Sequence, residues 1–163
     1  MIVPLRLTSG GTNGMANSVI KTNKELALSF CEAFSEGDWP RFEELCAEDF
    51  RWRAPTSQRR QSAAVQAAPL LNADPGWSRS EMISIFRDTK ERCVDGHFSL
   101  TPVTVTAEAD RVCVEALGHA VAAMNARTYE NRYHHLFVCR SGRLIELREY
   151  QDTLHLFDVW MAP

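Results

Sequence analysis

The sequence predicts an α+β domain in which N-terminal helices pack on one face of a curved antiparallel sheet that encloses a pocket. Apolar residues recur at helical spacing in the first half of the chain and alternate at strand spacing over residues 97–150. Helices that precede an antiparallel sheet are typical of the α+β class. The length of 163 residues fits one domain, which we expect over residues 17–163 after a disordered tail at residues 1–16.

Two helices are expected near the N-terminus. The first covers residues 22–36, where Thr22 and Glu25 form a capping box. Its apolar residues lie at helical spacing: Ala27, Phe30, Cys31 and Phe34. The second helix is short and begins after an N-cap residue, Asp38, that precedes a tryptophan and a proline.

A short strand and a long loop are expected next. In "DFRWRAP", residues 49–55, apolar and charged residues alternate until Pro55 ends the strand. Residues 56–77 are interrupted by prolines and are predicted to be a loop. Loops of this length in compact domains are often functional, so we take this one as the candidate lid of the pocket. A capping box formed by Ser78 and Glu81 then begins a third helix.

The rest of the chain predicts a meander of four strands and a final helix. The third helix is expected to end at residues 95–96, and Asp152 is expected to cap a short helix at the C-terminus. The turns between the strands are expected near residues 108–111, 124–127 and 141–142.

The last hairpin, residues 130–153, carries polar side chains on both of its faces. We expect a type I turn followed by a bulge at Gly142, because a two-residue loop would require a positive φ at Ser141. The bulged hairpin places Tyr133 opposite Glu149, whereas the two-residue loop would place His134 there.

The bulged register assigns each side chain of the hairpin to a face. The inner face is expected to carry Asn131, Tyr133, His135, Phe137, Leu147, Glu149 and Gln151. The outer face is expected to carry Arg132, His134, Arg148, Tyr150 and Asp152.

The candidate catalytic residue is Glu149, with Tyr133 and His135 as its hydrogen-bonding partners. Enclosure and hydrogen bonds both tune a carboxyl group for proton transfer, so Glu149 is suited to act as a general acid or base. The alternative is a polar cluster with a structural role only. Four residues are expected to contact a ligand: Trp52, Asn131, Phe137 and Leu147.

We expect no metal and no cofactor. The adjacent pair His134-His135 cannot chelate one ion, because neighbouring side chains on a strand point to opposite faces. His135 and Glu149 together supply only two ligands, one fewer than a catalytic zinc site needs.

Charge and hydropathy exclude two classes of partner. The net charge is −3 and lysines and arginines are scattered, so no nucleic-acid partner is expected. No apolar run approaches the roughly 20 residues of a membrane helix, so no membrane partner is expected. The five cysteines are widely spaced and include no C-x-x-C pair, which favours buried, reduced thiols and a cytoplasmic protein.

Two stretches carry a resemblance to a known family: "LALSFCEAFSEGDWPRFEELCAEDFRWRAP" and "YENRYHHLFVCRSGRLIELREYQDT". Over about residues 22–160 the chain resembles the nuclear transport factor 2-like superfamily. It is most similar to the SnoaL-like branch, which is related to polyketide cyclases and ketosteroid isomerases. The resemblance implies a cone-shaped, cystatin-like fold with a deep apolar pocket, and a homodimer formed through the outer face of the sheet.

The catalytic residues of two related enzyme groups carry over poorly. The general base of ketosteroid isomerases falls on Ala54, which disfavours that mechanism. The catalytic trio of limonene epoxide hydrolases falls on Ala116, Gly118 and Glu149, so only one of its three members is kept. Their water-positioning Tyr and Asn fall on Trp52 and Ala54, which also disfavours the hydrolase mechanism.

The pattern that remains is similar to that of the cyclases, in which one carboxylate acts on a reactive substrate. We therefore expect a cofactor-independent lyase, isomerase or cyclase that uses Glu149 as acid or base on an apolar cyclic or polyketide-like molecule. The alternative is a non-catalytic module that binds an apolar ligand or a protein partner.

Overall fold

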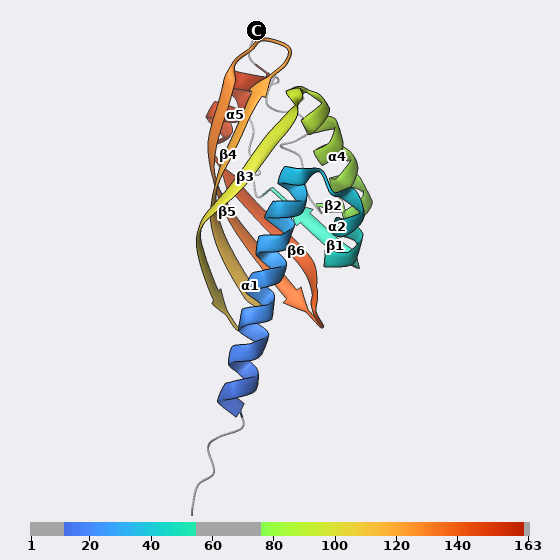
Figure 1. Ribbon diagram of the computed structural model, residues 1–163, viewed down its shortest axis with the longest axis vertical. Coiled ribbons are helices and arrows are strands. Elements are labelled where there is room, and N and C mark those ends of the chain that lie inside the picture. The colour runs from blue at the N-terminus through green and yellow to red at the C-terminus, as the bar shows by residue number, and fades with distance from the viewer. Residues whose placement is uncertain (1–11, 55–75, 162–163) are drawn as a thin grey trace, which may run out of the picture.

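The structure is a computed structural model that describes residues 12–54 and 76–161. Helices α1 (Thr12–Glu36), α2 (Trp39–Leu45) and α4 (Arg79–Glu91) lie on one side of a curved six-stranded sheet, as the α+β prediction requires (Figure 1). The candidate lid, residues 56–77, lies outside the described residues except for Gly76 and Trp77. Within the described ranges, no helix combines the length and the hydropathy needed to cross a membrane.

Helix α1 spans Thr12–Glu36 and therefore begins earlier than the sequence predicts. The capping box expected at Thr22 does not start the helix, because no proline in residues 12–21 interrupts the helical hydrogen bonds before it. Residues 12–16 are thus helical and not part of a disordered tail, whereas residues 1–11 lie outside the described residues. The predicted apolar face is confirmed by the burial of Ala27, Phe30, Cys31 and Phe34.

The two following helices are capped as predicted. Helix α2, Trp39–Leu45, begins at Asp38, whose carboxylate accepts a hydrogen bond from Arg41 N at 3.3 Å. Helix α4, Arg79–Glu91, begins with the Ser78 capping box. It ends before the predicted stop at residues 95–96, which belong to strand β3.

The strands occur in the order β2-β1-β6-β5-β4-β3. Their bounds are β1 Cys46–Arg53, β2 Trp77–Ser78, β3 Cys93–Glu108, β4 Arg111–Ala122, β5 Thr128–Arg140 and β6 Arg143–Gln151. Strands β3 to β6 form the predicted antiparallel meander, and β1 adds to its edge parallel to β6. Helix α5, Thr153–Trp160, follows β6 and is capped by the Asp152 carboxylate, as predicted.

The turn between β5 and β6 differs from the prediction. Ser141 has a φ of 51° and Gly142 a φ of 75°, and Arg140 pairs directly with Arg143. These are the features of a two-residue type I′ turn, in which both central residues have positive φ. The prediction is wrong here because Ser141 adopts the positive φ that side-chain-bearing residues rarely take.

A bulge lies further along β6 instead of at the turn. Cys139 pairs with Leu144, and Val138, the residue that precedes Cys139 in β5, pairs with Glu146. Ile145 is therefore an extra residue on β6, and it exchanges the faces of all residues that follow it.

The displaced bulge changes the pairing but keeps the predicted faces. His135 lies opposite Glu149 and Tyr133 opposite Gln151, so the expected pairing of Tyr133 with Glu149 is wrong. The inner face of the hairpin is nevertheless the predicted one, because one bulge separates the turn from Glu149 in either register.

The core lies between α1 and the inner face of the sheet. The ring centroid of Phe30 is 4.9 Å from that of Phe42 and 5.2 Å from that of Phe137, in edge-to-face contacts. Lys90 of α4 ties the end of α1 to this core, since its ammonium donates to the carbonyls of Phe34 and Ser35 at 3.1 and 2.6 Å.

Candidate functional site

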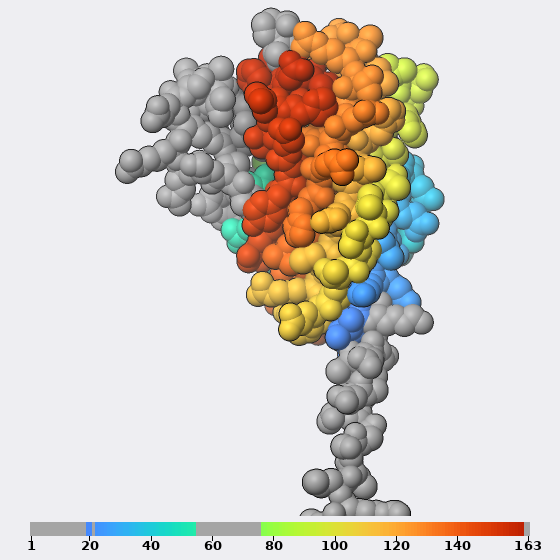
Figure 2. Space-filling view, turned by 90° about the vertical axis from the view of Figure 1, so that its left-hand side faces the viewer, coloured from blue at the N-terminus to red at the C-terminus, as the bar shows by residue number. Residues whose placement is uncertain are grey.

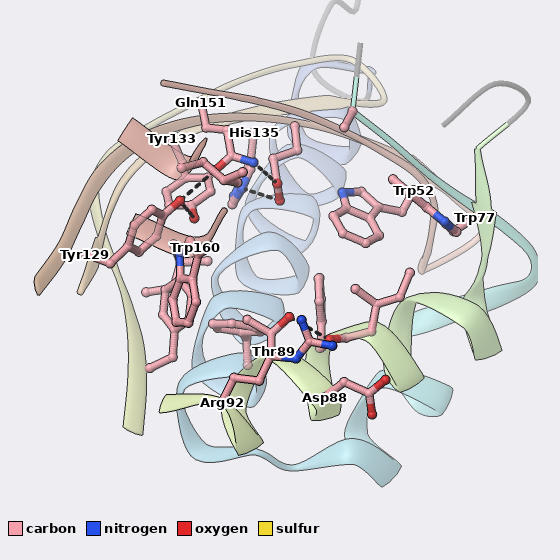
Figure 3. A pocket seen from close by; sticks show the side chains of 18 of the residues that line it. Trp52, Trp77, Asp88, Thr89, Arg92, Tyr129, Tyr133, His135, Gln151 and Trp160 are labelled. Carbon is pink, nitrogen blue, oxygen red and sulfur yellow. Dashed lines mark hydrogen bonds and ion pairs between the residues drawn. The ribbon is translucent and has the colours of Figure 1, made fainter. Parts of the chain in front are cut away.

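A cavity of about 580 Å³ lies between the inner face of the sheet and helices α4 and α5 (Figure 3). Most of its lining is apolar, including Phe34, Trp52, Trp77, Phe86, Phe98 and Trp160. Strands β5 and β6 supply a polar wall made of Tyr129, Tyr133, His135, Glu149 and Gln151. A cavity of this size with a few convergent polar groups is typical of a small-molecule site.

Glu149 and His135 lie at the centre of the polar wall. Glu149 is 9% exposed and His135 is 1% exposed. His135 Nε2 lies 3.3 Å from Glu149 Oε2, but neither imidazole nitrogen has hydrogen-bond geometry to any residue that the structure describes. The other carboxylate oxygen, Oε1, accepts a hydrogen bond from Gln151 Nε2 at 3.2 Å. The imidazole therefore keeps hydrogen-bonding capacity that no described residue uses.

The direction of the hydrogen bonds behind Glu149 is set by Asn131. Asn131 Oδ1 accepts from Asp152 N at 3.2 Å, so its Nδ2 is the atom that donates to the Tyr129 hydroxyl at 2.8 Å. The Tyr129 hydroxyl donates its one proton to Gln151 Oε1 at 2.8 Å. Gln151 then presents its amide N–H to Glu149, which orients the carboxylate toward the cavity.

Tyr133 belongs to this network but does not contact Glu149 as expected. Its hydroxyl lies 2.8 Å from that of Tyr129. Because Tyr129 already donates to Gln151, Tyr133 is the donor of this bond. Burial raises the pKa of both phenols, so both remain protonated in the folded protein at neutral pH.

Gly118 of β4 makes room for the ring of Tyr133. A Cβ atom at this position would lie 2.5 Å from Tyr133 Cε2 and 3.2 Å from Phe98 Cε2. The absence of a side chain at Gly118 therefore lets the phenol lie flat against the sheet and reach Tyr129.

Of the seven predicted site residues, four line the cavity: Trp52, Tyr133, His135 and Glu149. Three do not line it, and their predicted ligand contacts are corrected by the structure. Asn131 is 2% exposed and directed into the hydrogen-bond network, and Phe137 and Leu147 are fully buried in the core. Alternation identifies the face of a strand but not the position along it where the core gives way to the cavity.

Sequence reasoning missed Tyr129 and Gln151 as members of the site. Both have the strand parity of Tyr133 and Glu149, and both line the cavity. Gln151 is predicted on the inner face but is not assigned to the site, and Tyr129 shares the strand parity of Tyr133, so parity is the available signal for both.

The indole of Trp52 has an unused hydrogen-bond donor. Trp52 is 5% exposed, and its Nε1 has no hydrogen-bond partner among the described residues. The ring lies 4.5 Å from Trp77 and 5.0 Å from Phe86, centroid to centroid. Figure 3 shows the nitrogen of Trp52 turned toward the side of the cavity on which His135 lies.

Among the residues that the structure describes, the buried thiols and the possible metal ligands give no second site. Burial raises the pKa of the Cys31 and Cys46 thiols to about 12, which makes both poor nucleophiles at neutral pH. In residues 12–54 and 76–161, no three His, Cys, Asp or Glu side chains are grouped to hold a metal ion. The expectation of a metal-free, cofactor-free protein stays a prediction.

Comparison with known proteins identifies the family. The sequence profile of the SnoaL-like domain matches residues 27–147. The chain therefore belongs to the SnoaL-like family, and the resemblance expected from its sequence is confirmed. No sequence among the curated proteins matches this chain.

Solved structures agree with the nuclear transport factor 2-like fold. IdmH of Streptomyces antibioticus, described as a candidate polyketide cyclase, is 16% identical over 86% of this chain and 99% of its own, with a TM-score of 0.68. A candidate SnoaL-like polyketide cyclase of Jannaschia sp. CCS1 is 18% identical over 88% and 94% of the two chains, with a TM-score of 0.67.

An epoxide hydrolase of M. tuberculosis, described as LEH-like, is also similar in structure. It is 13% identical over 85% of this chain and 89% of its own, with a TM-score of 0.62. At such identities these likenesses establish the fold and not the reaction.

Proposed function

We propose that this SnoaL-like protein is a cofactor-independent lyase, isomerase or cyclase in which Glu149 moves a proton on an apolar cyclic or polyketide-like molecule. The observation that supports it is a nearly buried carboxylate, held by Gln151 and lying 3.3 Å from His135, at the wall of an aromatic cavity. The descriptions of the IdmH and Jannaschia proteins as candidate polyketide cyclases agree with this reaction class.

The proposed chemistry needs only one acid–base group. The Glu149 carboxylate takes a proton from a carbon next to a substrate carbonyl, and the electron pair of that C–H bond moves toward the carbonyl oxygen. When the double bond moves, the Glu149 carboxylic acid returns the proton to carbon; when the ring closes onto a second carbonyl, it delivers the proton to the oxygen of that carbonyl. His135 Nε2 lies 3.3 Å from Glu149 Oε2, so the imidazole is placed beside the reacting carboxylate.

Replacement of Glu149 by Gln tests this proposal. The assay is the exchange of the hydrogens next to the carbonyl of 2-tetralone for deuterium in D₂O, followed by NMR. We expect the wild-type protein to accelerate exchange over buffer and Glu149→Gln to lose about 10²–10⁴-fold of that acceleration. The affinity for 2-tetralone should change little, because the amide is nearly isosteric with the carboxyl group.

The matched control is Glu146→Gln, which removes the same charge from the same strand. Glu146 is paired with Arg53 and Arg148, outside the cavity lining, so this variant should keep the wild-type exchange rate. Equal rates for wild type and Glu149→Gln would exclude a catalytic role for the carboxylate. Binding of 2-tetralone without accelerated exchange would support the alternative, a ligand-binding module.

We further propose that the protein forms a homodimer through the outer face of the sheet. Figure 2 shows this face, on which the strands form much of the surface. Leu117 is 42% exposed and Tyr150 46% exposed, which supports an apolar contribution to the contact. Sedimentation equilibrium should give twice the protomer mass, and Tyr150→Glu should shift it toward the monomer.

A reducing cytoplasm is the compartment that we propose. Its support is that all five cysteines are free thiols and four of them are buried. The expected absence of nucleic-acid and membrane partners stays a prediction.

A further inference from the structure

The donor left unused on Trp52 is unusual for a buried polar atom. Most buried N–H groups in folded proteins have a hydrogen-bond partner. Trp52 Nε1 has no such partner among the described residues, although only 5% of the residue is exposed. Trp52 lines the cavity, but its Nε1 is itself almost inaccessible to solvent, so a ligand reaches this atom only if the side chains around it shift.

Neighbouring rings fix the direction in which this donor points. Trp52 pairs with Trp77 across strands β1 and β2, and the two indoles lie 4.5 Å apart at an angle of 35°. Phe86 of α4 contacts Trp52 at 5.0 Å in an edge-to-face arrangement. Rotation of the indole would break both contacts, so the N–H stays directed toward the side of the cavity that holds His135 (Figure 3).

The chemistry of the opposite wall restricts what this donor can bind. The polar wall carries one acidic side chain, Glu149, and the other two charged side chains of the lining, Asp88 and Arg92, lie on the α4 side of the cavity (Figure 3). A negatively charged ligand group would be favoured beside Arg92, whereas at the polar wall it would be repelled by the Glu149 carboxylate and would gain only one neutral hydrogen bond from Trp52. A carbonyl oxygen accepts that bond without adding charge, and the surrounding aromatic rings favour a flat, apolar body.

We propose that Trp52 Nε1 donates a hydrogen bond to a ligand carbonyl oxygen and thereby selects flat polycyclic ketones. The step that follows rests on the proposed function: Glu149 takes the proton from the neighbouring carbon, the C–H electron pair forms a C=C bond, and the carbonyl π electrons move onto the oxygen. The N–H of Trp52 stabilises the negative charge that develops there. The return of the proton from Glu149 reverses this flow of electrons.

A pair of probes that cannot react isolates the role of Trp52. 9-Fluorenone carries a carbonyl between two aromatic rings and has no hydrogen on the adjacent carbons that a base can remove. Fluorene has the same ring system with a CH₂ group in place of the carbonyl. Their affinities are measured for the wild type and Trp52→Phe, and the carbonyl stretching frequency of bound fluorenone is measured by infrared spectroscopy.

We expect Trp52→Phe to weaken fluorenone binding about 3- to 10-fold, as for the loss of one neutral hydrogen bond, and to affect fluorene much less. The carbonyl frequency of fluorenone, lowered when it is bound to the wild type, should rise in the variant. The matched control is Trp39→Phe, which removes an indole that stacks on Phe42 outside the cavity lining and should leave both readouts unchanged.

A second measurement covers the case in which Trp52→Phe does not fold. In the wild type, the indole N–H signal of Trp52 should move downfield in the NMR spectrum with fluorenone but not with fluorene. The proposal is overturned if fluorenone does not bind saturably, if this signal does not move, or if the lowered carbonyl frequency persists in Trp52→Phe. Persistence would make His135 or a water molecule the donor.

These outcomes are independent of the reaction proposed for Glu149. Fluorenone binding does not require proton transfer, so a catalytically silent protein can still show the Trp52 effect. Conversely, deuterium exchange that depends on Glu149 together with no effect of Trp52→Phe would preserve the proposed function and remove this inference.

Discussion

Asn131 determines which atoms of the polar wall donate and which accept. Its Oδ1 is occupied by the backbone N–H of Asp152, which begins the capping turn of α5. This contact leaves Asn131 Nδ2 to donate to the Tyr129 hydroxyl. Tyr129 in turn donates to Gln151, and Gln151 donates to Glu149. A residue expected to touch the ligand therefore acts one layer behind the cavity, through the side chains that it orients.

The close approach of Tyr133 to Gly118 leads to a prediction about stability. Gly118→Ala would place a methyl group 2.5 Å from Tyr133 Cε2, so the ring must move away from the sheet. We expect a loss of about 1–3 kcal/mol in the free energy of unfolding, as for other overpacked sites. Urea denaturation followed by circular dichroism measures it.

A double-mutant cycle tests whether the Tyr133 ring is the cause. In a Tyr133→Leu background, which lacks the aromatic ring, Gly118→Ala should cost clearly less than in the wild type. The same cost in both backgrounds would show that Phe98, at 3.2 Å, or the backbone of β4 is responsible.

At the level of secondary structure, the β5–β6 hairpin combines a tight turn with a separate bulge. The turn gives Ser141 a φ of 51° and Gly142 a φ of 75°. Without the bulge at Ile145, the two-residue turn would place Glu149 opposite His134 and on the outer face. One extra residue therefore brings the proposed acid–base group into the cavity.

The turn geometry predicts opposite effects for two neighbouring substitutions. Ser141→Asn should raise the free energy of unfolding by about 0.5–1 kcal/mol, because Asn tolerates positive φ and Asn-Gly is the favoured type I′ pair. Gly142→Ala should lower it by about 1–2 kcal/mol. No heavy atom lies within 4 Å of a Cβ at Gly142, so this loss would come from the backbone alone.

Thermal unfolding of both variants checks this pair of predictions. A stabilisation of about 1 kcal/mol corresponds to roughly 2–4 °C for a chain of this size. If Ser141→Asn destabilises the protein, the turn in solution is not the two-residue type seen here.

The elements with local signals could be predicted from the sequence, and the registers could not. The N-caps Asp38, Ser78 and Asp152 form as expected because a capping side chain and the N–H groups it accepts from lie within three residues. The position of the bulge depends on pairings between residues distant in sequence. For the same reason the site was found in part: Glu149 and His135 meet, but Phe137 lies too deep along β5.

For the molecule as a whole, two buried tyrosines that keep their protons predict that the free energy of unfolding falls at alkaline pH. Burial raises the pKa of Tyr129 and Tyr133 above the ordinary value of 10.0. Unfolded tyrosines lose their protons near pH 10, while the folded ones keep them. The contribution of these two tyrosines to the free energy of unfolding is therefore fully present below pH 10 and falls as the pH rises above it. The expected slope is roughly 1.4 kcal/mol per pH unit for each tyrosine.

Urea unfolding between pH 9 and 11.5 measures this slope. Buried thiols act in the same direction, since burial raises the pKa of Cys139 to about 11 from 9.0. Tyr133→Phe isolates the contribution of one tyrosine. Above pH 10 the free energy of unfolding of this variant should fall less steeply with pH than that of the wild type, by about 1.4 kcal/mol per pH unit. Titration of Tyr129 and Tyr133 near pH 10 in the still folded protein, seen by tyrosinate absorbance, would contradict the prediction.

The cavity shares side chains with the core, and this limits how ligand choice can change. Phe30, Phe34 and Phe98 are nearly inaccessible to solvent and support the packing of α1 on the sheet, yet each also lines the cavity. Phe157 and Trp160 of α5 line it as well but are only half-buried. Relatives that accept bulkier or smaller molecules should therefore diverge in the C-terminal helix first, where a substitution alters the fit without weakening the framework.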